Sequence, residues 1–74
     1  MAGTDERQAL SQTGGERGWN RRESGRTDVF LRGKYRIRVI WQGDDVISGA
    51  SLLDDEMYEA YTRDLIKVRA WLKK

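Results

Sequence analysis

The stretch KYRIRVIW, residues 34–41, alternates in character with a period of two. In an extended segment one face receives Tyr35, Ile37, Val39 and Trp41. The other face receives Lys34, Arg36, Arg38 and Ile40. This alternation predicts a β-strand that buries its apolar face and leaves a basic face outside.

Two further segments have the properties of strands and flank this one. Residues 27–32, TDVFLR, are rich in β-forming residues and lead into Gly33, which predicts a turn. Residues 46–53, VISGASLL, follow the turn-forming residues 42–45, and their Gly49 indicates a bulge. The links have the length of hairpin loops, so the order predicts a three-stranded antiparallel sheet.

The C-terminal part shows a helical period instead. Its apolar residues recur at spacings of three and four and form one stripe, made of Met57, Tyr61, Leu65, Val68 and Leu72. Asp54-Asp55-Glu56 precedes the stripe and suits the first turn of a helix, beside the positive end of its dipole. Asp64 falls inside the stripe, so a break near residues 61–64, with Thr62 or Asp64 capping a second segment, remains an alternative.

Residues 1–26 contain five glycines, many charges and only Leu10 and Trp19 as large apolar side chains. Such a segment buries too little surface to offset the loss of backbone entropy, which predicts a disordered basic tail. A short helix over residues 6–11 would be marginal in isolation. We therefore expect an α+β domain over residues 27–74, in which a three-stranded antiparallel sheet packs on one C-terminal helix.

The composition points away from several classes of protein. The 74 residues include neither cysteine nor histidine, which removes disulfides and the usual zinc ligands. The acidic run 54–56 is better explained as a helix start than as a cation site, so we expect no metal and no cofactor. Ser48 and Ser51 have no histidine to activate them, so we expect a protein that is not an enzyme.

The cellular setting follows from the lack of long apolar runs. No apolar run approaches the roughly 20 residues of a membrane-spanning helix. The first residues are polar and acidic, unlike a secretory signal. We expect a cytoplasmic protein with no membrane contact, which would lie in the host cytoplasm if a phage encodes it.

The charges are distributed unevenly along the chain. The net charge is +2, yet residues 17–38 hold eight cations against Glu23 and Asp28, which is +6 for that stretch. Such asymmetry indicates an anionic partner. The candidate nucleic-acid-binding residues are Arg17, Trp19, Arg21, Arg22, Arg26, Arg32, Lys34, Arg36 and Arg38.

Each part of this candidate set has a purely structural alternative. The basic side chains at 34, 36 and 38 are also what the solvated outer face of an antiparallel sheet normally carries. Trp19 would stack on a base or anchor in a partner's pocket, or it would fold back on the sheet and enlarge a small core. Both interpretations of Trp19 remain open at this point.

Two resemblances accompany these patterns. The segments Tyr35–Trp41, Ser48–Ala50 and Tyr61–Leu65 resemble those of short uncharacterised proteins of actinobacteria and their phages, which implies no particular activity. The expected order of elements is similar to that of the arm-type DNA-binding domain of tyrosine integrases. In that family the face of a three-stranded sheet enters the major groove. The likeness lies in architecture and in the basic strand, so it is an analogy of fold.

The leading hypothesis is a small non-enzymatic protein that binds nucleic acid through a basic sheet face and tail. The alternative is a protein-interaction module, such as a small phage-type regulator or inhibitor that docks on a host protein with an acidic surface. Trp19, Tyr58 or Ile66 would then be the anchors. A homodimer is also open, because so short a chain gains from burying more surface.

Overall fold

The computed structural model describes residues 5–43 and 46–73. It contains two helices and five strands, in an α+β arrangement. In chain order they are α1 (Glu6–Glu16), β1 (Asn20–Ser24), β2 (Thr27–Arg32), β3 (Tyr35–Trp41), β4 (Ile47–Asp54), β5 (Met57–Thr62) and α2 (Leu65–Leu72). The predicted α+β class is confirmed, whereas the predicted three strands and one helix become five strands and two helices.

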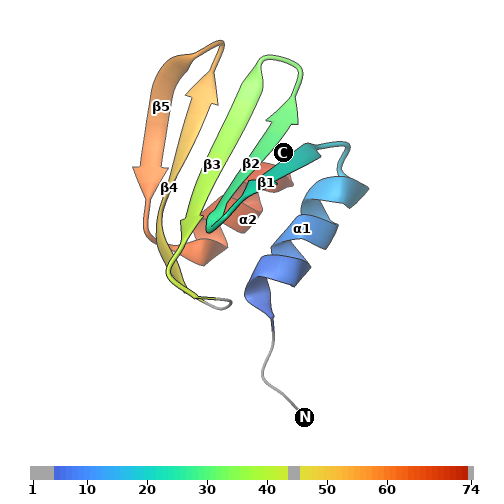
Figure 1. Ribbon diagram of the computed structural model, residues 1–74. Helices are drawn as coiled ribbons and strands as arrows, with labels where there is room; N and C mark the ends of the chain where they lie inside the picture. Colours follow the sequence, from blue (N-terminus) through green and yellow to red (C-terminus); the bar gives the residue numbers. More distant parts are fainter. Residues whose placement is uncertain (1–4, 44–45, 74) are drawn as a thin grey trace.

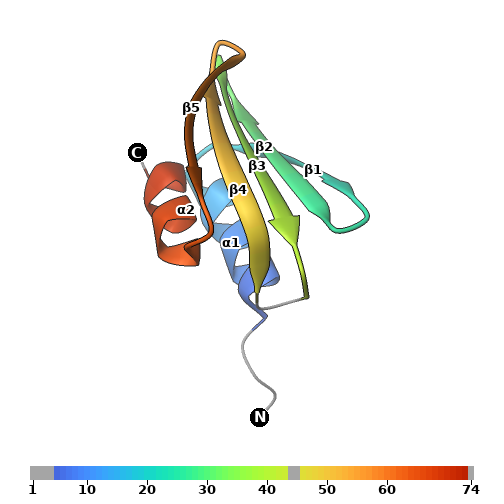
Figure 2. The same ribbon diagram turned by 90° about the vertical axis from the view of Figure 1, so that its left-hand side faces the viewer.

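The five strands form one antiparallel sheet in the order β1-β2-β3-β4-β5, so each strand pairs with its neighbours in the chain. Both helices lie on the same face of this sheet (Figure 1). The view turned by 90° shows the opposite face without a helix (Figure 2). The sheet therefore has one covered face and one that we call the outer face.

The central strands follow the predicted pattern. In β3 the side chains of Ile37, Val39 and Trp41 are buried, while Arg36 and Arg38 are exposed. Tyr35, expected on the buried face, is 39% exposed, because it lies at the end of the strand beside the β2–β3 turn. The predicted strands 27–32 and 46–53 correspond to β2 and β4. Gly33 has a φ of +60° in the predicted turn, and Asp44 and Asp45 of the next predicted turn lie outside the described residues.

The bulge predicted at Gly49 is present beside it. Ile40 pairs with Gly49, but Trp41 pairs with Ile47, so Ser48 has no partner in β3. The extra residue keeps both Ile47 and Ala50 on the covered face, where they are buried.

The prediction of a helix starting at Asp54–Glu56 is wrong. Asp55 and Glu56 have φ values of +53° and +68°, and they form the two-residue turn between β4 and β5. Two positive φ values are typical of the hairpin turn whose twist matches that of the flanking strands. The apolar spacing that suggested a helix is overridden because β5 pairs with the open edge of β4 along its length.

The alternative break near residues 61–64 is confirmed. Asp64 is the N-cap of α2, and its carboxylate accepts a hydrogen bond from the backbone N–H of Ile66 at 2.9 Å. The hydroxyl of Thr62 accepts from the N–H of Asp64 at 3.0 Å. Val68 and Leu72 are buried in the same core cluster as the apolar residues of β3, as predicted, and Leu65 is partly buried against it.

The prediction of a disordered N-terminal tail is wrong for the residues that form α1 and β1, and residues 1–4 lie outside the described residues. The short helix predicted over residues 6–11 extends to Glu16. Leu10 is fully buried and Trp19 is 6% exposed. The indole N–H of Trp19 donates to the carbonyl of Leu72 at 2.9 Å, which ties the N-terminal part to the end of α2.

Helix α1 approaches the sheet closely at Gly14. A Cβ atom at this position would lie 2.8 and 2.9 Å from two ring carbons of Phe30. Glycine is thus required for close packing here, at some loss of intrinsic helix propensity. The helix also contacts α2, where Arg69 donates to Glu6 at 2.8 Å.

A buried carboxylate lies at the centre of this packing. Asp28 of β2 is fully buried and accepts hydrogen bonds from Nε of Arg7 at 2.9 Å and from the indole of Trp41 at 2.9 Å. A second nitrogen of Arg7 donates to it at 3.0 Å, and Arg21 approaches to 3.1 Å. A buried charge needs such partners, and together they join α1, β1, β2 and β3.

Replacing Asp28 by Ala removes this carboxylate and leaves the buried donors of Arg7 and Trp41 without it. We expect a loss of about 3–5 kcal/mol in the free energy of unfolding, measured by urea denaturation. Glu23→Ala is the control, since Glu23 meets the same Arg7 and Arg21 at an exposed site, and it is expected to lose less than about 1 kcal/mol. Equal effects of the two changes would contradict the central role of Asp28.

Replacing Leu10 by Ala tests whether α1 belongs to the core. Because Leu10 is fully buried, we expect a loss of about 2–5 kcal/mol in thermal or urea unfolding. Gln12→Ala, an exposed change on the same helix, should stay within about 0.5 kcal/mol. A Leu10→Ala protein as stable as the parent would mean that the core does not depend on α1.

Candidate functional site

The register of the sheet determines which side chains stand on the outer face, because directly paired residues of antiparallel strands point to the same side. One cross-strand row runs through Arg22, Val29, Arg38, Ser51 and Tyr61. The next row runs through Asn20, Leu31, Arg36, Leu53 and Tyr58. Each row thus has an arginine on the central strand and a tyrosine on the edge strand β5.

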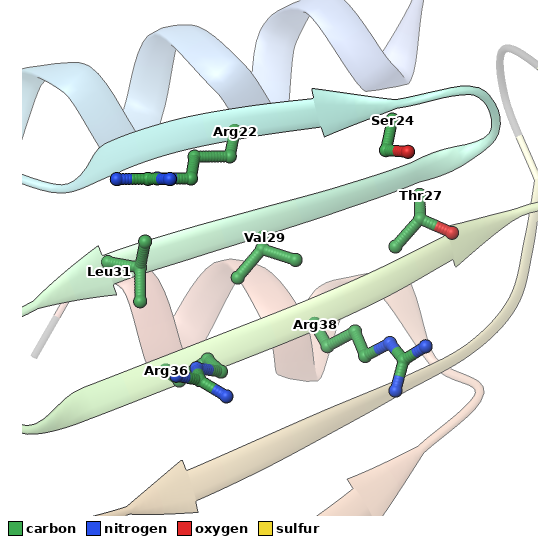
Figure 3. A pocket seen from close by; sticks show the side chains of 7 residues that line it. All are labelled: Arg22, Ser24, Thr27, Val29, Leu31, Arg36 and Arg38. Carbon is green, nitrogen blue, oxygen red and sulfur yellow. The ribbon is translucent and has the colours of Figure 1, made fainter.

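A shallow hollow of about 660 Å³ lies over the β1–β3 part of this face. Figure 3 shows its side chains on the side of the sheet away from both helices. The residues that line it are Arg22, Ser24, Thr27, Val29, Leu31, Arg36 and Arg38. Val29 and Leu31 form a half-buried apolar floor, and the three arginines stand around it.

The charge on this face is unbalanced. Within the strands, no position that the register places on the outer face carries a carboxylate. Among residues 5–43 and 46–73, none forms an ion pair or a side-chain hydrogen bond with the guanidinium groups of Arg22, Arg36 or Arg38. Asp55 and Glu56, in the β4–β5 turn, line a smaller hollow together with Arg36. Acidic side chains therefore border the outer face at this turn.

Three carboxylates beside the helices are paired with cations. Asp28 and Glu23 meet Arg7 and Arg21, and Glu6 meets Arg69. The sheet therefore separates its charges: these acids and their partners lie beside the helices, and three arginines without a partner in the described part of the chain lie on the opposite side.

Three of the nine predicted binding residues come together on the outer face, namely Arg22, Arg36 and Arg38. Lys34 was expected beside them, but it lies in the β2–β3 turn with its ammonium group 3.5 Å from a carboxylate oxygen of Asp54. The alternation of β3 begins only at Tyr35, so it does not extend to Lys34.

Trp19 was predicted either to stack on a base or to enlarge the core, and it enlarges the core. It is buried, and the guanidinium carbon of Arg32 lies 4.4 Å from the centre of its ring. One ring face is thus covered by a cation of the same chain, so neither Trp19 nor Arg32 joins the outer face.

The remaining predicted cations do not form one surface. Arg21 points to Asp28 on the covered side. Arg26 donates to the carbonyl of Gln42 at 2.9 Å, and Arg17 caps the C-terminal end of α1. The basic tail expected from the sequence is therefore divided among structural roles once it folds.

The tyrosines of β5 are functional candidates that the sequence reasoning missed as a pair. Tyr61 was assigned to the helix core and is 54% exposed, while Tyr58, named as an anchor, is 63% exposed. The β-forming residues of 57–62 after an Asp-Glu turn were the available signal. Ile66 is 72% exposed on α2, so it shares no face with Tyr58.

The described part of the chain contains neither a cluster of metal-binding side chains nor a helix that could span a membrane. No group of three or more Asp or Glu side chains there is placed to hold a metal ion. No helix among those residues is long and apolar enough to cross a membrane. No protein-family model matches the sequence, and no curated protein or solved structure is significantly similar to it. The two resemblances therefore stay predictions.

Proposed function

We propose that this protein binds nucleic acid through the outer face of its sheet and acts by binding rather than by catalysis. The observation that carries the proposal is the group of three arginines, Arg22, Arg36 and Arg38, which have no carboxylate partner among residues 5–43 and 46–73 and lie on the face opposite the helices. Like charges held close together repel one another, and an anionic partner relieves that repulsion.

The chemistry of the three side chains suits phosphate. A guanidinium group is planar and permanently charged, and its N–H groups match two oxygens of one phosphate. Side chains two positions apart along a strand are separated by about 6.7 Å, and those two strands apart by about 9.6 Å. Arg36, Arg38 and Arg22 therefore present cations at intervals comparable to those between successive phosphates of a nucleic-acid backbone.

The apolar floor strengthens these contacts. Val29 and Leu31 are half-buried between the arginines, so a bound phosphate would displace water from a surface of lower polarity than bulk solvent. Attraction between opposite charges rises as the local dielectric constant falls. Ser24 and Thr27 line the same hollow and offer hydroxyl donors that phosphate oxygens accept.

A second candidate is a protein partner with an acidic surface. It is favoured by the apolar side chains of the same face, since Ile40 is 41% exposed and Tyr58 is 63% exposed. Exposed aromatic and arginine side chains are common in the centres of protein interfaces. Nucleic acid is preferred because three arginines line the hollow against two apolar side chains, Val29 and Leu31, and its lining among the described residues includes no carboxylate.

Replacing Arg36 and Arg38 together by Glu should abolish binding of nucleic acid and preserve the fold, since both side chains are exposed. With about three phosphates engaged, the slope of log K against log salt for the parent should be about −2 to −3. Fluorescence anisotropy with labelled random-sequence DNA and RNA at two or more salt concentrations measures both quantities.

The matched control replaces Lys67 of α2 and its C-cap residue Lys73 by Glu, which changes the net charge by the same amount on the covered side. We expect it to retain most of the parent's affinity. Loss of binding in both double variants would mean that binding depends on net charge and not on the outer face. No binding by the parent at tens of micromolar in low salt would end the nucleic-acid proposal and favour the acidic protein partner.

A further inference from the structure

We propose that the outer face selects single-stranded nucleic acid, with Tyr58 and Tyr61 as stacking platforms for two bases. This inference rests on the proposed function and adds the class of ligand to it. The two tyrosines stand at the β5 end of the same rows that carry Arg36 and Arg38.

A bulge places both tyrosines on this face. Residues three positions apart in a regular strand point to opposite sides. In β5, Tyr61 pairs with Ser51 and Tyr58 pairs with Leu53, because the register shifts and Glu59 has no partner in β4. The extra residue restores Tyr58 to the side of Tyr61. Glu59 instead lines a separate hollow, which Trp71 also lines.

The ring of Tyr61 is held against the sheet. A Cβ atom at Gly49 would lie 2.8 Å from Cζ and 2.9 Å from Cε1 of this ring. The phenol therefore lies across the backbone at Gly49, where a larger residue would displace it. Its hydroxyl also lies 3.5 Å from the carbonyl of Ser48, and 54% of the residue remains exposed. A ring fixed on one side and open on the other is suited to stacking with a base.

The spacing of each row fits one nucleotide. Strands β3 and β5 are two strands apart, so the backbone positions of an arginine and a tyrosine in one row are about 9.6 Å apart. A long guanidinium side chain on one strand can hold the phosphate while the base reaches the ring on the other. The two rows are about 6.7 Å apart along the strands. A nucleic-acid backbone that runs parallel to β3 would therefore pass from Arg36 to Arg38.

Single-stranded and duplex nucleic acids differ in whether the flat faces of their bases are accessible to the tyrosines. In a duplex the flat faces of the bases are stacked inside the helix, so the tyrosines would meet only sugar and phosphate. In a single strand the bases can turn out and stack on aromatic rings. The arginines attract both forms through phosphate, but the tyrosines add affinity only for unpaired bases.

The experiment compares labelled single-stranded DNA, single-stranded RNA and a duplex of the same sequence, each about ten nucleotides long, by anisotropy. The expected result is at least tenfold tighter binding of a single strand than of the duplex. Tyr58→Leu together with Tyr61→Leu should lower single-strand affinity by on the order of tenfold or more and leave duplex affinity nearly unchanged. The Tyr58→Phe and Tyr61→Phe double variant keeps both rings and should bind like the parent.

A second measurement does not depend on variants. The ring-proton resonances of the two tyrosines in the parent protein should move upfield when a single strand is added, as expected for rings stacked on bases. Equal or tighter duplex binding, or ring resonances that do not move, would overturn the single-strand inference. If Arg36→Glu with Arg38→Glu still abolished the duplex binding, the proposed function would stand without it. No binding of any nucleic acid by the parent would overturn both.

Discussion

The buried carboxylate of Asp28 is the contact on which the rest of the structure depends. It joins Arg7 of α1, Arg21 of β1 and Trp41 of β3 to the middle of β2. An isolated charge in this position would be strongly destabilising, so the carboxylate is stable only where all of these elements are assembled. This requirement makes the N-terminal part of the chain a component of the fold. The same contact holds α1 in one orientation on the sheet, which the helix approaches closely at Gly14.

The same arrangement determines where charge is left over. Asp28, Glu23 and Glu6 are paired with cations beside the helices, so the carboxylates that would neutralise the outer face are placed elsewhere. The arginines of β3 alternate with its buried residues, and the strand cannot bury one set without exposing the other. The unpaired cations of the outer face are thus a direct consequence of how the covered face is packed, and they supply the basis of the proposed function.

Bulges and turns adjust this simple alternation. The bulge at Ser48 keeps Ile47 in the core, and the bulge at Glu59 places Tyr58 on the outer face with Tyr61. Both bulges lie in β4 and β5, the half of the sheet that α2 contacts. The edge strand β5 thus presents two aromatic side chains on the outer face.

The sequence by itself determined the central strands, because the period of two over residues 35–41 and the turn at Gly33 depend on neighbouring residues only. It also predicted the exposed arginines at 36 and 38, and it offered a cap at Thr62 or Asp64 as an alternative to one helix starting at Asp54. The tertiary structure alone decided the fates of the two ends of the chain. The pattern of residues 57–62 fits a helix or a strand, and pairing with the open edge of β4 selects the strand. Residues 5–24 lack a periodic apolar face, and their order comes from contacts distant in sequence, such as Arg7 with Asp28 and Trp19 with Leu72. Local patterns carry no information about such partners, because the free energy that orders these segments arises only when the core and the buried charge come together.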